Sequence, residues 1–536
     1  MQFAFLLVQF FLVVLAYASA NHAYAAGNDT LAQSLSVPSS TTTITLTAQN
    51  VPHNARSVAV SFGPAYPLKA SANNRYLVDQ NNVPFLMVGD SPQSLITNLS
   101  LAEATIYMLN RRRYGINTLW INTLCNWPNI CNKDGATFDG IKPFFVAGDL
   151  STPNPEYFQR VADIVAVAAE NGIVVILDPI ETSGWLGVLR ANGESKAFSF
   201  GKFLGARYAS LSNIIWMHGN DFQTWRDPSD DHLVQAVAKG IRSTDTKHIN
   251  TVELNYLTSG SLEDSSWAPL IELNAAYTYF PTYAQISIEY NRPNFKPVFM
   301  VEANYEFEHL YATDGGSIQN LRKQEYWSML SGAAGQLYGS ATTWKLQKGW
   351  ESSLDTPGVV QLSYMKNLFF KRKWYDLVPD QTHTVVTSGY SGLSCLIGEL
   401  FAYFNENTAS FASKMLDLIR RHIVDFGGGV TFDTCVTSAR DSGGLLVIAY
   451  LPATRAVTVD MSKISGEVTA QWFDPTNGEY VDIVGSPFAN NGSRRFTPPG
   501  KNSSGDGDWV LVLEAQGATR AEPLPATRSL GAEGRL

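Results

Sequence analysis

Short apolar runs alternate with amphipathic stretches over most of the chain. The runs are rich in β-branched and aromatic residues and lie at 85–89, 117–121, 173–178, 213–217, 249–253, 275–280, 297–302 and 335–339. Runs of this length and composition are typical of buried parallel strands. Amphipathic stretches typical of helices lie between several of them, at 101–114, 155–171 and 317–332. Strands that alternate with helices in this way predict a (β/α)8 TIM barrel.

A different pattern begins after about residue 375, where the sequence favours β-strands. Apolar runs typical of strands lie at 445–451, 457–460 and 510–513. Residues 472–480 carry Pro475 and Asn477-Gly478 between apolar positions, which predicts a hairpin. We therefore predict a barrel domain over residues 71–375, followed by a small antiparallel β-sandwich domain over residues 376–515.

Both ends of the chain differ from these domains. Residues 3–16 are almost wholly apolar and are followed by the small residues Ala18–Ala20, which predicts a signal peptide over 1–20 and a secreted protein. The extreme N-terminus has no Lys or Arg, so an uncleaved membrane anchor is the alternative. No later apolar run is long enough to span a bilayer, so we expect no stable membrane span after cleavage. We expect residues 21–70 to form an N-terminal extension or linker, and residues 516–536 a disordered tail.

The composition is that of a globular protein with more than one domain. The chain has 536 residues, of which 45% are hydrophobic and 16% charged. Its net charge is −9 and its only basic triplet is Arg111–Arg113, which argues against nucleic acid as a partner. The sequence contains no phosphate loop, dinucleotide fingerprint or Gly-x-Ser-x-Gly elbow, and we predict no cofactor. Sequons that would make an exported chain a glycoprotein lie at Asn28, Asn98, Asn491 and Asn502.

The cysteines also suit an exported protein. Their spacing suggests the pairs Cys125–Cys131 and Cys395–Cys435, although four cysteines allow three pairings. The second pair lies in a segment of about residues 388–443 that interrupts the predicted sandwich and has a helical stretch at 411–422, so we treat it as an insert. No Cys-x-x-Cys motif or close His pair is present, and we predict no metal site.

Two acidic residues follow predicted strands on opposite sides of the barrel. Asp221 comes after the fourth strand and Glu302 closes the seventh. The carboxyl ends of barrel strands form the mouth in which barrel active sites are built. Two carboxylates that flank a sugar can cleave a glycosidic bond, so we predict Asp221 as general acid/base and Glu302 as nucleophile. The alternatives are an Asp221 that caps the following turn and a Glu302 that pairs with an arginine.

Further residues would line the same mouth. The amide of Asn220, beside Asp221, could hold a substrate hydroxyl group. The other candidates for substrate binding lie in or just after predicted strands, or offer an aromatic ring: Asp90, Asn122, Asp178, His218, Tyr279, Tyr338 and Trp344. The polar ones could equally cap loops and the aromatic ones could equally pack in the core or at the rim. His218 is more typical of a residue that positions others than of a ligand.

Several segments resemble the apiosidase-like domain of glycoside hydrolase family 140. The segment Arg75–Asp90 resembles the opening of that domain. Four later segments resemble later parts of it: Trp216–Asp221, Pro297–Tyr305, Gly332–Gly339 and Gly349–Gly358. The resemblance covers roughly residues 71–380, and the family's catalytic Asp and Glu fall on Asp221 and Glu302. The hairpin at 472–480 resembles a domain that often follows, which carries a collagen-binding label. The insert at 388–443 departs from the usual pattern of that second domain.

The resemblance implies a hydrolase that acts on branched plant cell-wall polysaccharide, with characterised activity at apiose in pectin side chains. We therefore expect a secreted retaining glycoside hydrolase with a pectic carbohydrate substrate. One alternative is a catalytically silent protein that binds carbohydrate or matrix, and another is an inverting hydrolase. The carboxyl separation distinguishes these, being about 5–5.5 Å in retaining enzymes and about 6.5–9.5 Å in inverting ones. The sequence leaves the oligomeric state open.

Overall fold

The computed structural model describes residues 63–224, 226–256, 258–308, 315–390 and 434–518. Most of the predicted N-terminal extension and most of the predicted insert lie outside these residues. So do the predicted signal peptide, the helix predicted at 411–422, Cys395, Asn28 and the predicted tail beyond residue 518.

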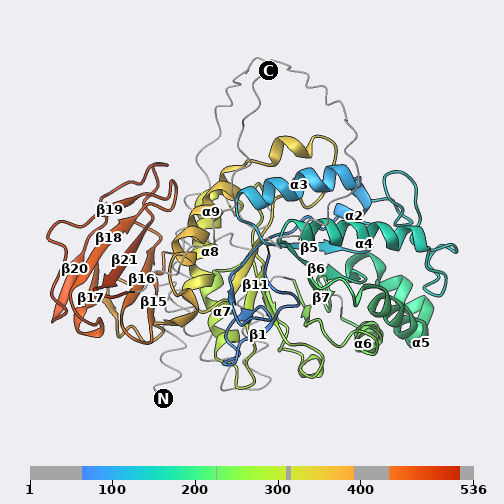
Figure 1. Cartoon of the computed structure of the whole chain (residues 1–536), viewed down its shortest axis with the longest axis horizontal. Coiled ribbons are helices and arrows are strands. Elements are labelled where there is room, and N and C mark those ends of the chain that lie inside the picture. The colour runs from blue at the N-terminus through green and yellow to red at the C-terminus, as the bar shows by residue number, and fades with distance from the viewer. Residues whose placement is uncertain (1–62, 225, 257, 309–314, 391–433, 519–536) are drawn as a thin grey trace, which may run out of the picture. The chain divides into compact units, whose positions relative to one another are not determined.

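A barrel of parallel strands forms the first part of the described chain (Figure 1). Its strands are β4 (Met87–Asp90), β5 (Thr118–Asn122), β6 (Val174–Asp178), β7 (Ile214–Gly219), β8 (Asn250–Glu253), β10 (Asn274–Thr278), β11 (Val298–Glu302) and β12 (Gly335–Tyr338). Neighbouring strands pair in parallel in the order β8-β7-β6-β5-β4-β12-β11-β10. Every apolar run that predicted a barrel strand overlaps one, which confirms the TIM-barrel fold.

Successive residues of these strands face opposite sides of the barrel wall. On β5, Trp120 packs inside the barrel, whereas Leu119 and Ile121 pack against the helices outside. On β6, Ile176 is inside and Val175 is outside. Because both faces are buried, both sets of alternate positions are apolar, and the strands read as continuous apolar runs.

Between β8 and β10 the barrel closes without a strand ladder, through the Ser261 side chain and through the backbone amides of Glu272 and Leu273, which donate to the Asn250 carbonyl of β8. The short strand β9 (Thr258–Gly260) runs antiparallel to β10. Just after it, the Ser261 hydroxyl donates to the Val252 carbonyl of β8 at 2.6 Å and accepts from the Ala275 amide of β10 at 2.7 Å. One hydroxyl group therefore links two strands that are not neighbours in the hydrogen-bonding order. Three residues carry too little periodicity for β9 to be predicted from the sequence.

A small antiparallel sheet seals the amino-terminal end of the barrel. It consists of β1 (Lys69–Ala70), β2 (Leu77–Val78) and β3 (Pro84–Phe85), directly before β4. Leu68, Leu77 and Phe85 belong to the same buried cluster as the side chains inside the barrel. The open mouth is therefore at the carboxyl ends of the strands.

Helices cover the outside of the barrel (Figure 1). They are α2 (Leu95–Asn98), α3 (Leu101–Arg113), α4 (Pro155–Glu170), α5 (Thr182–Tyr208), α6 (Pro228–Arg242), α7 (Thr282–Tyr290), α8 (Ile318–Leu330) and α9 (Pro357–Phe370). The three predicted helices are confirmed as α3, α4 and α8. At the start of α3, Ser100 accepts the Glu103 amide while the Glu103 carboxylate accepts the Ser100 amide, a capping box that fixes where the helix begins.

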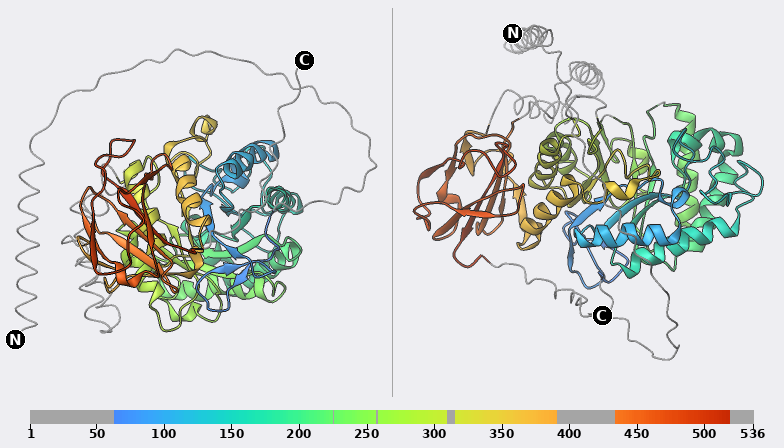
Figure 2. Two further views of the ribbon diagram at one scale, coloured as in Figure 1. Left: turned by 60° about the vertical axis from the view of Figure 1, so that its left-hand side comes forward. Right: turned by 90° about the horizontal axis from the view of Figure 1, so that it is seen from above.

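An antiparallel β-sandwich follows the barrel, as predicted (Figures 1 and 2). One sheet contains, in order, β13 (Leu377–Pro379), β15 (Thr437–Asp441), β16 (Leu446–Leu451), β21 (Trp509–Ala515), β18 (Val468–Phe473) and β19 (Tyr480–Asp482). The other contains β14 (Val386–Ser388), β17 (Val457–Asp460) and β20 (Ser493–Phe496). The hairpin predicted at 472–480 is the β18–β19 pair.

The larger sheet of the sandwich is buried on both faces. On β16, Val447 and Ala449 face the smaller sheet, whereas Ile448 and Tyr450 pack into the cluster that includes the barrel helices. Tyr450 stacks on Tyr326 of α8, with ring centroids 4.8 Å apart. Figure 1 shows α8 and α9 between the barrel strands and the sandwich. Barrel and sandwich therefore share one hydrophobic interface.

Two disulfide-bonded cysteines in the described residues form the predicted pair Cys125–Cys131. Cys435 is also disulfide-bonded, and its expected partner Cys395 lies outside the described residues.

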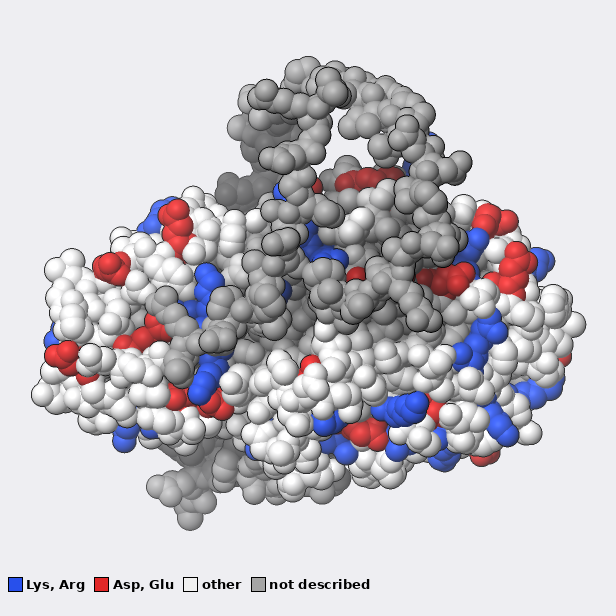
Figure 3. All heavy atoms as spheres, viewed as in Figure 1, with Lys and Arg blue, Asp and Glu red and all other residues white. Residues whose placement is uncertain are grey.

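On the surface face shown in Figure 3, acidic and basic side chains intermix over barrel and sandwich. Of the sequons, Asn491 is exposed, whereas the Asn502 amide is buried and donates to the Asp508 carbonyl. No helix within the described ranges has the length and apolarity needed to cross a membrane.

An ion pair is buried where the sandwich meets the barrel. Arg322 of α8 donates from Nε and Nη2 to the two carboxylate oxygens of Asp508, both at 2.8 Å. The side chains are 2% and 0% exposed. Tyr450 and Asn502 also donate to the Asp508 carboxylate. The pair is thus fully desolvated and held by neighbours from the sandwich.

Asp508→Ala should destabilise the protein by about 3 kcal/mol, because Arg322 stays buried and keeps only Asp506, which is 34% exposed, as an ion-pair partner among the described residues. Asp139→Ala is the matched control, since Asp139 forms a bidentate pair with Arg160 but on the surface. We expect it to cost about 0–1 kcal/mol. Chemical denaturation measures the free energy of unfolding of both variants. Equal losses of stability would show that the buried Arg322–Asp508 pair stabilises the protein no more than the surface pair does.

Candidate active site

Two carboxylates lie at the mouth of the barrel. Glu302 is the last residue of β11 and is buried. Asp221 lies two residues beyond β7 and is half-buried. In chain order these are the seventh and fourth barrel strands, the strands that the sequence indicated.

A left-handed turn brings Asp221 to the mouth. Gly219, Asn220 and Asp221 follow one another with φ angles of 107°, 73° and 54°. A Cβ atom on Gly219 would lie 2.2 Å from the Glu253 carbonyl oxygen, so only glycine fits there. Asn and Asp are among the side-chain-bearing residues that best tolerate positive φ. The order Gly-Asn-Asp therefore suits a turn that a β-branched residue could not follow.

One phenol bridges the two carboxylates. Tyr277 Oη lies 3.0 Å from Asp221 Oδ1 and 2.9 Å from Glu302 Oε1. A hydroxyl has a single proton, so it can donate to only one carboxylate at a time and must accept from the other. The shared contact also limits the distance between these two carboxylate oxygens to about 6 Å at most, close to the range of retaining sites.

Three tyrosines surround Glu302. Tyr279 Oη is 2.8 Å from Oε1, beside the Tyr277 contact, and Tyr305 Oη is 2.6 Å from Oε2. Burial raises the pKa of Glu302 above its usual value, while these three hydrogen bonds favour its ionised form. Tyr277 and Tyr279 lie two apart on and just after β10, so both side chains face the same way.

Asp221 is poised as the acid of the pair. Burial, reinforced by the negative charge of Glu302, raises the pKa of Asp221 to about 7, against the opposing hydrogen bond from Tyr277. A protonated Asp221 can donate to Tyr277, and Tyr277 can then donate to an ionised Glu302. The geometry therefore favours one proton and one negative charge on the pair.

Buried amides connect the two sides of the site. Gln93 donates from Nε2 to Tyr305 Oη at 3.1 Å and accepts from Asn220 Nδ2 at 3.2 Å. Tyr305 in turn donates to Glu302. The turn that carries Asp221 and the strand that carries Glu302 are thereby held in one hydrogen-bonded network.

Further acids lie among the barrel strand ends. Glu253, the last residue of β8, accepts the Asp221 amide at Oε2 over 3.4 Å, and its Oε1 has no partner among the described residues. Burial, with the charges of Glu302 and Asp221, raises the pKa of Glu253 well above its usual value. Burial also raises that of Asp178, at the end of β6. No cluster of His, Cys, Asp or Glu in the described part of the chain is arranged to hold a metal ion.

The family described as "Apiosidase-like, catalytic domain" matches residues 71–376, which include both carboxylates and every barrel strand. The chain belongs to the apiosidase-like family. Membership makes the protein a glycosidase with a carbohydrate substrate. A second family, described as "Putative collagen-binding domain of a collagenase", matches residues 429–514 of the sandwich.

Solved structures support the fold of the apiosidase-like chain. A protein described as "Glycoside hydrolase" superimposes with a TM-score of 0.68 at 22% identity, covering 85% of this chain and 99% of that one. A glycoside hydrolase family 5 protein from Bacteroides vulgatus ATCC 8482 superimposes with a TM-score of 0.67 at 21% identity, covering 84% and 93%. A search of curated proteins found no significant match.

The structure brings several predicted residues of the apiosidase-like domain to the mouth. Asn220 and Tyr279 join the network around the carboxylates. Asn122 ends β5, where its backbone amide donates to the Gln93 carbonyl and its Oδ1 accepts from the Trp120 indole. Trp344 follows β12 and is half-buried, with its ring 5.9 Å from that of Trp127 in an edge-to-face contact.

Three predicted residues face the helices instead of the mouth. Asp90 pairs with Arg111 of α3, whose side chain is fully buried. His218 stacks on Trp267 at 5.7 Å and contacts Asn250, and burial lowers its pKa to about 4. Tyr338 donates to Glu306. The structure does not bring Asp90, His218 or Tyr338 to the carboxylate pair.

Sequence reasoning missed Tyr277, Tyr305, Gln93 and Glu253. Glu253 closes the predicted strand 249–253 in the same way as Glu302 closes its own, so the strand-end criterion could have found it. Tyr277 could have been found from its spacing to Tyr279 on one face of a strand. Gln93 lies in an irregular loop and carries no comparable signal.

Asp221→Asn should stabilise the protein at pH 8 and leave its stability unchanged near pH 4. An unfolded Asp titrates near about 3.9, whereas the folded Asp221 has a pKa of about 7. Between these values the folded state binds more protons than the unfolded state, so the free energy of unfolding falls as pH rises. Asn cannot ionise, yet its oxygen can still accept from Tyr277.

Thermal melts across this pH range measure the effect. We expect the variant to melt at least about 1 °C above the parent at pH 8, equivalent to about 1 kcal/mol for a chain of 536 residues. Asp163→Asn, at an exposed carboxylate of α4, is the control and should melt like the parent throughout. A variant that gains no stability at pH 8 would contradict the raised pKa.

Proposed function

We propose that the protein is a secreted retaining glycosidase that acts on pectic polysaccharide, with Asp221 as acid/base and Glu302 as nucleophile. The observation that carries the mechanism is the Tyr277 hydroxyl shared by both carboxylates at 3.0 and 2.9 Å. An inverting pair needs about 6.5–9.5 Å to admit a water molecule between the general base and the sugar. A single phenol in contact with both carboxylates favours the shorter spacing of a retaining pair.

In the first step, the ionised Glu302 attacks the anomeric carbon while Asp221 gives its proton to the departing oxygen. A glycosyl ester on Glu302 results, and Asp221 is left ionised. In the second step, Asp221 removes a proton from water, which attacks the same carbon and releases Glu302. The pKa of about 7 lets Asp221 be protonated for the first step and regain that proton in the second.

The tyrosines support the charge changes on Glu302. As a free carboxylate, Glu302 accepts from Tyr277, Tyr279 and Tyr305. These hydrogen bonds stabilise the carboxylate that must leave in the second step. The Tyr277 proton can then turn to Asp221 when that residue carries the charge, because the phenol reaches both groups.

Secretion and the pectic substrate rest on other observations. Residues 3–16 are apolar and precede small residues, and the Cys125–Cys131 disulfide suits an oxidising compartment. The pectic substrate rests on membership of the apiosidase-like family and on the sequence resemblance, which implies activity at apiose in pectin side chains.

Purified protein should release sugar from rhamnogalacturonan II, and Glu302→Gln and Asp221→Asn should each lose at least about 100-fold in kcat, because each removes a group needed in the transition state. Glu351→Gln, at an exposed carboxylate between β12 and α9, should keep full activity. Sugar release is followed by chromatography. Activity only on another glycan would reject the pectic substrate, and full activity in Glu302→Gln would reject the site.

Azide rescue should separate the two roles. With an activated aryl glycoside, Asp221→Ala plus azide should give a glycosyl azide of the same anomeric configuration as the substrate, because azide attacks the covalent intermediate. Glu302→Ala plus azide should give the opposite configuration, because azide takes the place of the nucleophile. Proton NMR of the products distinguishes these outcomes. The same configuration from both variants, or none from either, would contradict the assignment.

A further inference from the structure

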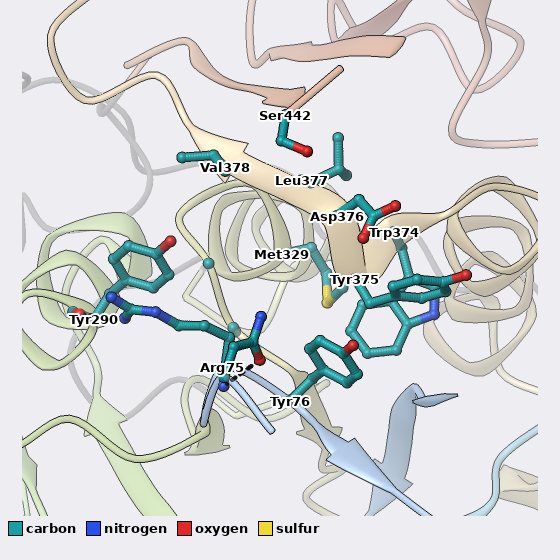
Figure 4. Close-up of a pocket in the computed structure, with 13 residues that line it drawn as sticks. Arg75, Tyr76, Tyr290, Met329, Trp374, Tyr375, Asp376, Leu377, Val378 and Ser442 are labelled. Carbon is teal, nitrogen blue, oxygen red and sulfur yellow. Dashed lines mark hydrogen bonds between the residues drawn. The ribbon is translucent and has the colours of Figure 1, made fainter. Parts of the chain in front are cut away.

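A second hollow opens where the barrel meets the sandwich. It encloses about 650 Å³, counting space open to solvent, and is lined by residues of both parts (Figure 4). The barrel residues that line it lie on segments that lead into the strands: Tyr76 precedes β2, Tyr290 ends α7 before β11, and Ala333 precedes β12. The hollow therefore lies toward the amino ends of the strands, whereas the carboxylates lie at the carboxyl ends. A five-residue strand separates these ends by about 16 Å.

Three aromatic rings gather at one end of the hollow. Tyr76 lies 5.8 Å from Trp374 and 5.5 Å from Tyr375, and the last two rings are 5.9 Å apart. Figure 4 shows them together, with Arg75 and Tyr290 at the opposite end. Tyr76 and Tyr375 are half-buried, so part of each ring remains accessible. Aromatic rings carry negative charge on their faces and attract the weakly positive C–H groups that line one side of a sugar ring.

Polar groups border the same rings. Asp376 follows Tyr375 directly and is exposed, and its carboxylate forms no ion pair or hydrogen bond with the described residues. Ser442, on the turn between β15 and β16 of the sandwich, adds a hydroxyl. A carboxylate can accept hydrogen bonds from two neighbouring sugar hydroxyl groups. Rings that pack against C–H groups and acceptors for hydroxyl groups are together the requirements for binding a saccharide.

The charges favour a neutral sugar over an acidic one. Arg75 is held away from the rings, with its guanidinium 3.9 Å from the Tyr290 ring centroid and 3.7 Å from that of Phe295. It also donates to the Tyr290 carbonyl at 2.6 Å. Beside the aromatic end, Asp376 interacts with the positive charge of Lys373 and the negative charge of Asp441, so these three groups together carry a net negative charge. A uronate carboxylate placed against the rings would be repelled.

We propose that this hollow is a second carbohydrate-binding site, in which Tyr76 and Tyr375 pack against a neutral sugar unit and Asp376 accepts its hydroxyl groups. It would hold a part of the polysaccharide remote from the bond being cleaved, since the catalytic carboxylates lie at the other end of the barrel. The sandwich then contributes one wall of a binding site. This inference rests on the protein being a glycosidase, and neither on the retaining mechanism nor on pectin as the substrate.

Native gels that contain soluble galactan or arabinan test the proposal without any catalytic assay. At least one of these neutral polysaccharides should retard the full-length protein. Asp376→Ala should weaken the retardation about tenfold, as expected for a lost charged hydrogen bond. Tyr375→Ala should weaken it by about the same factor, because it removes an aromatic ring that packs against the sugar. Asp376→Asn keeps the size of the side chain, guards against misfolding and should weaken it in the same direction. Asp163→Ala on α4 is the surface control and should bind like the parent.

Steady-state kinetics provide a second, independent measurement. The Asp376 and Tyr375 variants should raise KM for the polysaccharide and leave kcat, and all constants for a small aryl glycoside, unchanged. Retardation of the parent by polygalacturonate alone, by no neutral polysaccharide, or equally in parent and Asp376 variants would overturn the proposal. Because the gels report binding alone, a failure here is distinguishable from a failure of the proposed catalytic residues.

Discussion

Two carboxylates lie within hydrogen-bonding distance of one phenol in a buried site. Their proximity determines which protonation states and which neighbouring side chains the site can have. Within the described residues neither Asp221 nor Glu302 forms an ion pair, so only hydroxyl groups and protons can stabilise their charge. Burying two unpaired charges together would be very costly, and the pair therefore retains a proton. The raised pKa of Asp221 is the direct consequence. Tyr277 on β10, Tyr279 just after it and Tyr305 beyond β11 stabilise the remaining negative charge through hydrogen bonds.

Backbone geometry explains why an aspartate can occupy this position. A strand-end side chain such as Glu302 reaches the mouth directly, whereas Asp221 reaches it through three consecutive residues with positive φ. Such a turn is strained for residues other than glycine, and it persists only where neighbours hold it in place. Here Glu253 accepts the Asp221 amide and Gln93 accepts the Asn220 side chain. The acids and amides around the pair thus determine its spacing as well as its charge.

The barrel was predictable because its strands are buried on both faces, which leaves each as an unbroken apolar run. Positions of the side chains at the strand ends were less predictable, because adjacent residues of a strand point to opposite sides of the wall. Asp90 and Tyr338 both end strands, yet their partners Arg111 and Glu306 hold them on the helix side. Ser261 and Gln93 lie in irregular segments. Contacts between distant parts of the chain determine where these side chains lie, and the local sequence does not.

The sandwich is bound to the barrel by the same kinds of contact that stabilise a domain core. Alternate residues of β16 enter two different hydrophobic clusters, and the Arg322–Asp508 pair is desolvated between them. An interface that buries a sheet face and an ion pair resists the relative motion usual between domains joined by small polar contacts. The hollow beside Trp374 therefore has a fixed shape, because its walls belong to both parts. Because the second wall is rigid, Asp376 can contact a ligand without the surrounding chain first becoming ordered. This lowers the entropic cost of binding.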